Sequence, residues 1–150
     1  MDQTVTVKAK LLNIDEETAH SFMQTMVKYK DACNFISQYV FNHAFELKQS
    51  KLNKALYRDL RNKFGLKSQM AQSAIKTVIA RYKTVKTQLK QKPYRYDTGK
   101  KDVKGHAIWA QTFRNLSWLW YPIQFKRPQL DLQRNRDWSY LSSTKQISLN

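Results

Sequence analysis

Residues 68–90 read SQMAQSAIKTVIARYKTVKTQLK, and this stretch decides the fold that we expect. At about 100° per residue in an α-helix, one set of side chains forms an apolar stripe. These side chains are Ala71, Ala74, Ile75, Val78, Tyr82, Val85 and Leu89. The opposite stripe is polar and its charges are all positive: Gln69, Gln72, Lys76, Lys83, Thr87 and Lys90. The pattern predicts a helix with one face on a core and one basic face.

Two further helices are predicted on the N-terminal side of this stretch. Asp15 is a suitable N-cap, because its carboxylate can accept hydrogen bonds from the first turn of a helix. No glycine or proline follows before Gly65, and a wide apolar surface spans residues 22–47. Residues 53–64 carry a shorter pattern of the same period. The sequence therefore predicts three helices within residues 15–92.

The remaining segments are predicted to contribute strands. Residues 4–12 (TVTVKAKLL) alternate apolar and polar side chains, which is typical of a half-buried strand. Residues 94–106 (YRYDTGKKDVKGH) read as a polar connection, and a short helix is expected at about 108–115. Short alternating runs rich in aromatic residues occupy 117–150. We therefore expect an α+β chain in which the first strand joins a later sheet and the helices form an insertion.

Positive charge dominates the chain, with a net charge of +16 and a pI of about 10.0. Residues 51–92 carry twelve basic side chains and one acidic one, Asp59, so the acidic partners that ordinarily stabilise an exposed helix are missing. Such a balance predicts a polyanionic partner. Because no stretch approaches the ~18 consecutive apolar residues of a membrane span and no signal peptide is evident, nucleic acid is favoured over a membrane.

Catalytic and metal-binding patterns are not found. Cys33 is the single cysteine, and the three histidines are scattered along the chain, so no zinc-ligand spacing exists. With three glycines, the chain cannot build a glycine-rich phosphate loop from neighbouring residues. Glu16 and Glu17 are explained by capping of the first helix. The sequence predicts no catalytic residue, no metal site and no cofactor.

Two patterns fit nucleic-acid recognition more specifically. Gln69 and Gln72 share a stripe with Lys76, and a glutamine can bond bidentately to adenine while a lysine holds the backbone. Tyr94 and Tyr96 flank Arg95, and aromatic side chains in such surroundings can stack on unpaired bases. His43 and Cys33 lie on or near the apolar stripe of the first helix, which indicates a place in the core.

Several short motifs, in this order, resemble the N-terminal part of the TnpB (OrfB) proteins, the transposon-encoded RNA-guided nucleases ancestral to type V CRISPR effectors. They are V-x-V-K-x-K-L at 5–11, Asn42-His43, S-Q-x-A-Q-S-A-I-K at 68–76, R-Y-K at 81–83, F-K-R-P at 125–128, R-N-R-D-W-S at 134–139 and I-S-L at 147–149. The resemblance spans essentially the whole chain.

The resemblance implies a small antiparallel β-barrel, the wedge domain, formed by 1–14 and 93–150, with a three-helix recognition lobe inserted at 15–92. It implies binding of guide RNA and of double-stranded target DNA, with a short DNA motif beside the target being read. The family's RuvC-like nuclease domain and zinc module are absent from these residues. We therefore expect no enzymatic activity from this chain, with Mg and Zn belonging to the absent regions, and the remainder of a nuclease chain as a further partner. The expected location is the bacterial cytoplasm, at the nucleoid, with a phage or mobile element as the encoding source.

The resemblance and the charge pattern together give three sets of site residues. The DNA motif is expected to be read by Asn53, Ser68, Gln69 and Gln72. The nucleic-acid backbone is expected to be held by Lys54, Arg58, Arg61, Lys76, Arg81, Lys83, Lys86, Lys90, Lys126, Arg127, Arg134 and Arg136. Stacking on bases is expected from Tyr94, Tyr96 and Trp138.

Two other classes of function stay open on the sequence alone. A free-standing DNA-binding regulator, or a binding-only derivative of a transposon protein, would use the glutamine and lysine helix without any RNA. A basic structural module for ribosome or protein assembly would use only the charge.

Overall fold

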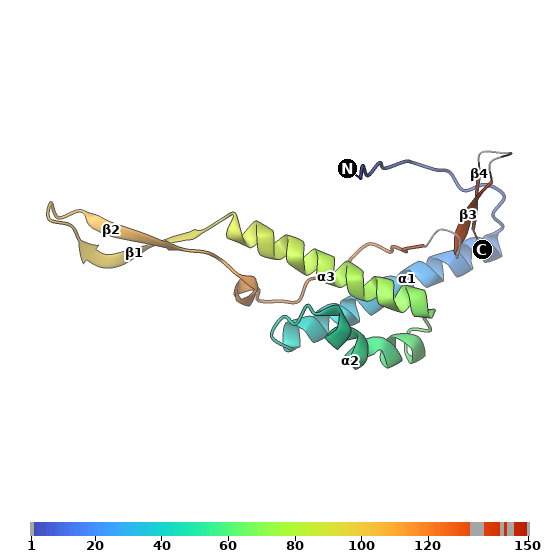
Figure 1. Cartoon of the computed structure of the whole chain (residues 1–150), viewed down its shortest axis with the longest axis horizontal. Helices are drawn as coiled ribbons and strands as arrows, with labels where there is room; N and C mark the ends of the chain where they lie inside the picture. Colours follow the sequence, from blue (N-terminus) through green and yellow to red (C-terminus); the bar gives the residue numbers. More distant parts are fainter. Residues whose placement is uncertain (1, 133–136, 142, 144–145, 150) are drawn as a thin grey trace.

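The computed structural model describes residues 2–132, 137–141, 143 and 146–149. Three α-helices come first: α1 (Glu16–Asn42), α2 (Gln49–Asn62) and α3 (Ser68–Lys90). The strands β1 (Tyr94–Lys101) and β2 (Ala107–Thr112) form one antiparallel hairpin, and β3 (Trp138–Leu141) and β4 (Gln146–Leu149) form another. A short 3-10 helix, η1 (Leu116–Trp118), follows the first hairpin. The expected α+β class with three helices is confirmed, and its sheets are two open pairs (Figure 1).

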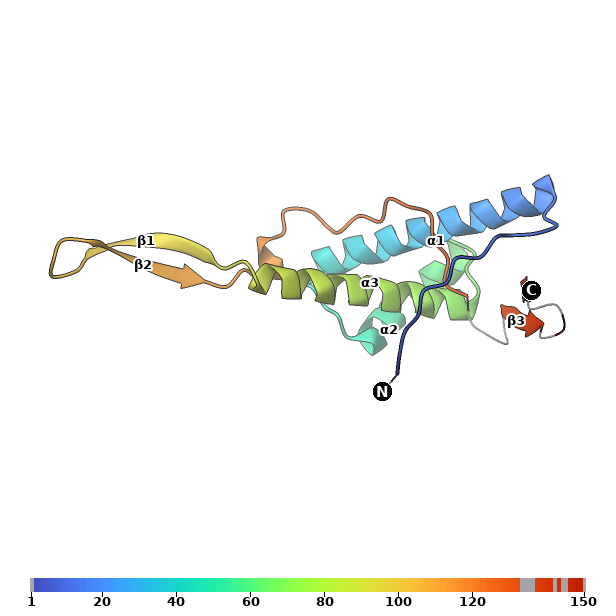
Figure 2. The ribbon, with the colours of Figure 1, turned by 90° about the horizontal axis from the view of Figure 1, so that it is seen from above.

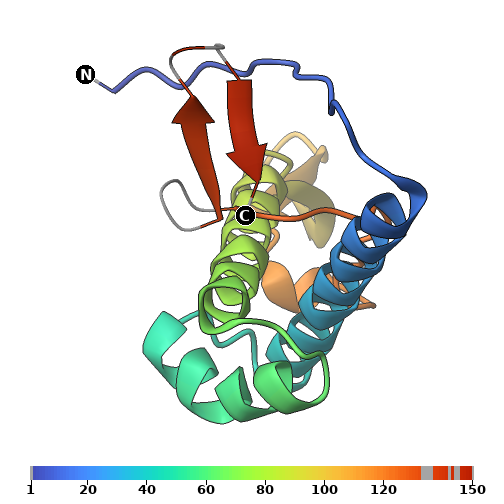
Figure 3. The same cartoon turned by 90° about the vertical axis from the view of Figure 1, so that its right-hand side faces the viewer.

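The core lies between the three helices, which form a triangle when viewed end-on (Figure 3). The stripe predicted from α3 is confirmed, because Ala71, Ala74, Ile75, Val78 and Tyr82 are all buried. From α2 the core receives Leu52, Leu56 and Leu60, and from α1 it receives Tyr29, Ala32, Cys33, Ile36 and Val40. Removing these apolar side chains from water is what holds the three helices together.

The start of α1 follows the sequence, whereas its end does not. The Thr18 N–H donates to Asp15 Oδ1 at 2.7 Å, so the predicted N-cap is confirmed. Hydrogen bonds from the Thr18 side chain and, to a smaller extent, from its backbone N–H lower the pKa of Asp15. The helix stops at Asn42 because Ala44 and Phe45 take positive φ angles of 54° and 58°. This reversal lets the Phe45 ring approach Tyr82, with 6.2 Å between ring centroids. Tertiary packing therefore ends α1 about five residues before the apolar pattern does.

Residues 119–132 form an extended strap that runs back along α1 (Figure 2). The Asn34 side chain bonds both the N–H of Phe125 (2.7 Å) and its carbonyl (3.0 Å). The Ile123 N–H donates to Tyr82 Oη at 3.2 Å, and the Ser37 hydroxyl donates to the Ile123 carbonyl at 2.5 Å. Side chains of the strap, including Leu119, Ile123 and Phe125, pack against the helical core. Helix side chains thus satisfy backbone groups that a neighbouring strand would satisfy in a sheet.

The first hairpin corrects two expectations from the sequence. Residues 94–106, expected to be a connection, form β1 and the hairpin turn, and residues 108–112, expected to be helical, belong to β2. Nearly every side chain of both strands is exposed, so there is no alternation between a buried and a polar face for a sequence pattern to detect. Gly99, at φ 75°, lies where the strand register shifts between Asp97 and Lys101.

The strand expected at 4–12 is not formed. These residues run past the helices without regular structure, and Val5 and Val7 are 71% and 79% exposed. An alternating segment becomes a strand only when a partner strand supplies its hydrogen bonds, and none of the described strands pairs with it. The prediction that alternating runs near the C-terminus form strands is confirmed for two of them, because β3 and β4 lie within these runs. None of the described helices is long and apolar enough to cross a membrane.

Candidate nucleic-acid interface

The solvent face of α2 is a row of cations. Lys54, Arg58 and Arg61 follow one another at helical spacing, on the side opposite Leu52, Leu56 and Leu60. All three are exposed. Lys51, on the same face, pairs with Glu46 at 3.2 Å, whereas no ion pair to a described residue is seen for Lys54 or Arg58. Two guanidinium groups and an ammonium therefore lie close together without carboxylates to neutralise them.

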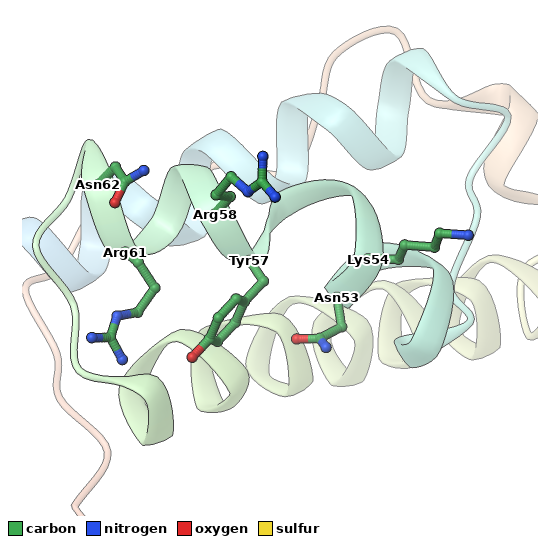
Figure 4. A pocket seen from close by; sticks show the side chains of 6 residues that line it. All are labelled: Asn53, Lys54, Tyr57, Arg58, Arg61 and Asn62. Carbon is green, nitrogen blue, oxygen red and sulfur yellow. The ribbon is translucent and has the colours of Figure 1, made fainter.

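Beside this row, α2 lines a shallow hollow of about 630 Å³ (Figure 4). Its lining consists of Asn53, Lys54, Tyr57, Arg58, Arg61 and Asn62. The Tyr57 ring carries the Arg61 guanidinium over its face, with 6.0 Å between the guanidinium carbon and the ring centroid. A hollow lined by cations, amides and an aromatic ring combines the groups that hold phosphates with groups that can contact bases.

The hollow is tied to the start of α3. The Tyr57 hydroxyl donates to Ser68 Oγ at 3.0 Å, which joins α2 to the first residue of α3. Ser68 lowers the pKa of Tyr57, because its hydroxyl can turn and donate to the phenolate when Tyr57 ionises, and the Arg61 guanidinium acts in the same direction. Ser68 was expected to read DNA, and the structure gives its hydroxyl a second role as a link between the two helices.

Asn53 has a buried acceptor without a donor. Its Oδ1 atom is buried and meets no hydrogen-bond donor among the described residues. Leaving such an atom unpaired costs about 1–3 kcal/mol. Because the atom is shielded from solvent, a ligand in the hollow could pair with it only after the Asn53 side chain turns outward.

Gln69 and Gln72 lie on the first turns of α3, and both are half-buried. In the antiparallel pair of α2 and α3, Tyr57 meets Ser68, so Asn53 and Gln72, one turn further along each helix, come to the same level. The Gln72 amide makes no hydrogen bond with a described residue, whereas Gln69 has a partner. Lys76 follows one turn later and is exposed. Three of the four expected base-reading residues thus lie on the first turns of α3, and Asn53 lies on α2, one turn before Tyr57.

The cations further along α3 do not all share one face. Lys83, Lys86 and Lys90 are exposed and continue the side of Lys76. Arg81 is five residues after Lys76 and so lies about 140° away around the helix axis. The expectation that the excess charge of this helix occupies a single face is therefore wrong for Arg81.

The other predicted residues are spread over the molecule. Lys126 and Arg127 are exposed on the strap. Tyr94 and Tyr96 are 44% and 41% exposed on β1, with nearly parallel rings 6.3 Å apart. Trp138 is half-buried on β3, and its indole N–H donates to the Leu132 carbonyl at 3.3 Å. Arg134 and Arg136 lie outside the described residues.

Three residues of interest were missed by the sequence reasoning. Tyr57 and Asn62 line the hollow, and Arg114 stacks on Trp118 with 5.8 Å between guanidinium carbon and ring centroid. For Tyr57 a signal existed, because it lies four residues before Arg61, on the flank between the apolar and basic faces of α2. Nothing in the sequence pattern marks Arg114. His43, expected in the core, is exposed and stacks on Tyr39 at the end of α1.

Within the residues that the structure describes, no group of three or more His, Cys, Asp or Glu side chains could hold a metal ion. Comparison with known proteins gives no family: no protein-family model, no curated protein and no solved structure matches this chain.

Proposed function

We propose that this chain binds nucleic acid as the N-terminal portion of a TnpB-like RNA-guided DNA endonuclease. In this role it binds guide RNA and double-stranded target DNA and reads a short DNA motif beside the target, and cutting belongs to a RuvC-like domain outside residues 1–150. Its place is then at the nucleoid. The support comes from the order of the sequence motifs together with the cationic surface of α2 and α3.

One observation carries the proposal furthest. Lys54 and Arg58, for which no ion pair to a described residue is seen, lie beside a hollow that is also lined by Asn53, whose buried Oδ1 meets no donor among the described residues. Cations hold phosphates without regard to sequence, whereas an asparagine or glutamine can pair with the edge of an adenine. A surface that combines both kinds of group is suited to gripping a duplex and selecting a site on it.

A wedge-like barrel is the finer part of the same proposal. The hairpins β1–β2 and β3–β4 both end in open edges, and residues 4–12 alternate without a partner strand. Open edges and an alternating segment are the parts from which a closed sheet is assembled. We propose that bound RNA, or further chain of the nuclease, brings such strands together.

The direct test is binding of target DNA with and without scaffold RNA, measured by gel shift. We expect RNA-dependent binding of the motif-bearing duplex that weakens with salt, and loss of it in Lys54→Ala/Arg58→Ala. The matched control is Lys28→Ala/Lys30→Ala on α1, in a segment where acidic residues outnumber basic ones. Binding of neither RNA nor DNA would contradict the proposal.

A free-standing DNA-binding regulator is the second candidate. It is favoured by one feature: the Tyr57 hydroxyl donates to Ser68 Oγ, so the chain's own side chains join α2 to α3 at the candidate interface. A sequence-selective complex with duplex DNA that needs no RNA would favour this candidate over the first.

A further inference from the structure

The hairpin β1–β2 projects from the C-terminal end of α3, away from α2 (Figures 1 and 2). It contacts the rest of the molecule mainly at its base, and almost all of its side chains are exposed. Exposed rings include Tyr94, Tyr96 and Trp109, at 44%, 41% and 55%. Aromatic rings exposed together in this way are typical of a surface that binds a ligand or partner.

Four planar side chains form a continuous row at the base of this hairpin. The Arg114 guanidinium lies over Trp118, 5.8 Å from its centroid. Trp118 contacts Tyr94 with 5.6 Å between ring centroids, and Tyr94 stacks on Tyr96 at 6.3 Å. The row Arg114–Trp118–Tyr94–Tyr96 therefore joins side chains of β1, of η1 and of the loop between β2 and η1.

The partner strand leaves the two tyrosine rings uncovered. In the register of the hairpin, Tyr94 lies opposite Thr112 and Tyr96 opposite Ala110. Alanine and threonine are too small to cover an aromatic ring, so each tyrosine keeps an exposed surface. On the other face of the ribbon, Arg95 lies over Trp109, 6.0 Å from its centroid.

Charge identifies the class of partner. Arg95, Lys100, Lys101 and Lys104 lie on or next to the hairpin, and no ion pair to a described residue is seen for any of them. The two acids are engaged locally. Asp97 accepts from the Gly99 N–H at 2.9 Å, and Asp102 accepts from the N–H groups of Lys104 and His106. The hairpin thus presents aromatic rings and cations together, which suits a ligand that carries both negative charge and planar aromatic groups.

Arg114 adds a second indication of a ligand at the base. Its Nε atom is buried and has no hydrogen-bond acceptor among the described residues. If the side chain turns toward solvent, an acceptor on a bound molecule, such as a phosphate oxygen, would satisfy it.

We propose that the row Arg114–Trp118–Tyr94–Tyr96 binds an unpaired segment of RNA, with bases stacked on the rings and phosphates held by the cations of the hairpin. Bases in a duplex already stack on their neighbours, so only unpaired bases offer a face to these rings. Thr112 is exposed and lies opposite Tyr94 in the strand register, and its hydroxyl is of a kind that can bond to a ribose 2′-hydroxyl. This assignment rests on the proposed function. It gives the two nucleic acids separate binding surfaces: α2 and α3 bind the duplex, and the hairpin binds unpaired guide RNA.

The test measures the affinity of the full chain for an unstructured 15-nucleotide RNA by fluorescence anisotropy. Tyr96→Ala is expected to weaken this binding about tenfold, within the range for one stacked base, and Tyr96→Phe to stay within twofold of wild type. RNA is also expected to quench indole fluorescence, and Trp118→Phe to lose part of that quenching. With scaffold RNA at a concentration that saturates both proteins, the affinity for duplex DNA is expected to be unchanged in Tyr96→Ala.

Four results would overturn the assignment: unchanged RNA affinity in Tyr96→Ala, equal loss of duplex binding, equal affinity for single-stranded DNA of the same sequence, or self-association of the wild type that Tyr96→Ala abolishes. The last would make the hairpin a contact between copies of the chain. The proposed function fails separately: unchanged duplex binding in Lys54→Ala/Arg58→Ala would contradict it while the hairpin result stands.

Discussion

At the scale of single residues, the candidate interface contains side chains suited to binding phosphates and other side chains suited to recognising the base sequence. Gln72 is half-buried near Asn53, and Lys76 is exposed one turn further along α3. An amide that pairs with a base edge contributes only at the correct sequence. An ammonium on a phosphate contributes at every sequence. The two residues are four apart on one helix and therefore form a matched pair for mutation.

Gln72→Ala is expected to reduce the preference for the cognate motif over a scrambled duplex by about 1–3 kcal/mol, with little change in binding to the scrambled duplex. Lys76→Ala is expected to weaken both complexes alike and to lower the magnitude of the salt slope by about one. Competition binding with the two duplexes measures both effects. Equal and negligible effects would leave a structural module as the remaining interpretation.

Ala44 lies in the left-handed region at φ 54°, which a residue with a Cβ atom seldom adopts. Ala44→Gly is expected to raise the free energy of unfolding by about 1 kcal/mol, because glycine adopts this conformation without strain. Ala55→Gly, in the exposed interior of α2, is the control and is expected to lower it by a similar amount. Urea unfolding of both variants measures the difference, and a loss of stability in Ala44→Gly would contradict the argument.

Burial raises the pKa of the Cys33 thiol to about 12, although a hydrogen bond with Gln129 acts in the opposite direction. The unfolded chain ionises this thiol near pH 9, so the unfolded state releases its proton first. Its contribution to stability is therefore complete below pH 9 and is lost as the pH rises from 9 toward 12. Stability of the wild type is expected to fall more steeply above pH 9 than that of Cys33→Ala. Parallel curves from urea unfolding at pH 8.0–10.5 would show that the thiol is not buried.

At the scale of elements, the strap is fixed to the helices by a small network around Tyr82. Its hydroxyl accepts from the Ile123 N–H and donates to the Ser37 carbonyl at 3.1 Å, and it lies 2.9 Å from the Ser37 hydroxyl. Because this network is buried, removing one hydroxyl leaves buried polar groups without partners.

Tyr82→Phe is expected to lower the free energy of unfolding by about 1–3 kcal/mol and to speed proteolysis within residues 119–132. Tyr94→Phe removes the hydroxyl of an exposed tyrosine that makes no hydrogen bond with a described residue, and it is expected to change stability by less than about 0.5 kcal/mol. Equal effects of the two changes would mean that the strap is not held through Tyr82.

The helices could be predicted from the sequence because each buries one apolar face, and this places apolar residues at helical spacing along the sequence. Leu56 and Leu60 on α2 and Val78 and Tyr82 on α3 are examples. The β1–β2 hairpin left no such record, since Tyr94, Tyr96 and Trp109 are all exposed. The strap was hidden for another reason: Asn34, Ser37 and Tyr82 satisfy its backbone from more than forty residues away in sequence, and only the folded chain brings them together.

The same reasoning applies to the candidate interface. Lys54, Arg58 and Arg61 could be found from charge and spacing alone. The buried Oδ1 of Asn53 and the bond from Tyr57 to Ser68 could not, because both depend on how α2 lies against α3.

At the scale of the whole molecule, the helices α2 and α3 and the projecting hairpin occupy different parts of an elongated chain (Figure 1), and both regions carry exposed cations. The net charge of +16 is unevenly distributed: residues 51–92 carry +11 and residues 93–112 carry +2, whereas residues 15–50 carry five acidic and three basic side chains. This uneven distribution of positive charge would both attract a polyanion from a distance and orient it on the chain.

The most direct test of the central claim is the salt dependence of duplex binding by wild type and by Lys54→Ala/Arg58→Ala. A plot of the logarithm of the association constant against the logarithm of salt concentration is expected to be linear. The double variant is expected to lower the magnitude of its slope by about 1.8, at about 0.9 per lost phosphate contact. Lys28→Ala/Lys30→Ala is expected to leave the slope unchanged. The same slope and affinity in the wild type and in Lys54→Ala/Arg58→Ala would contradict the assignment of α2 as a nucleic-acid surface.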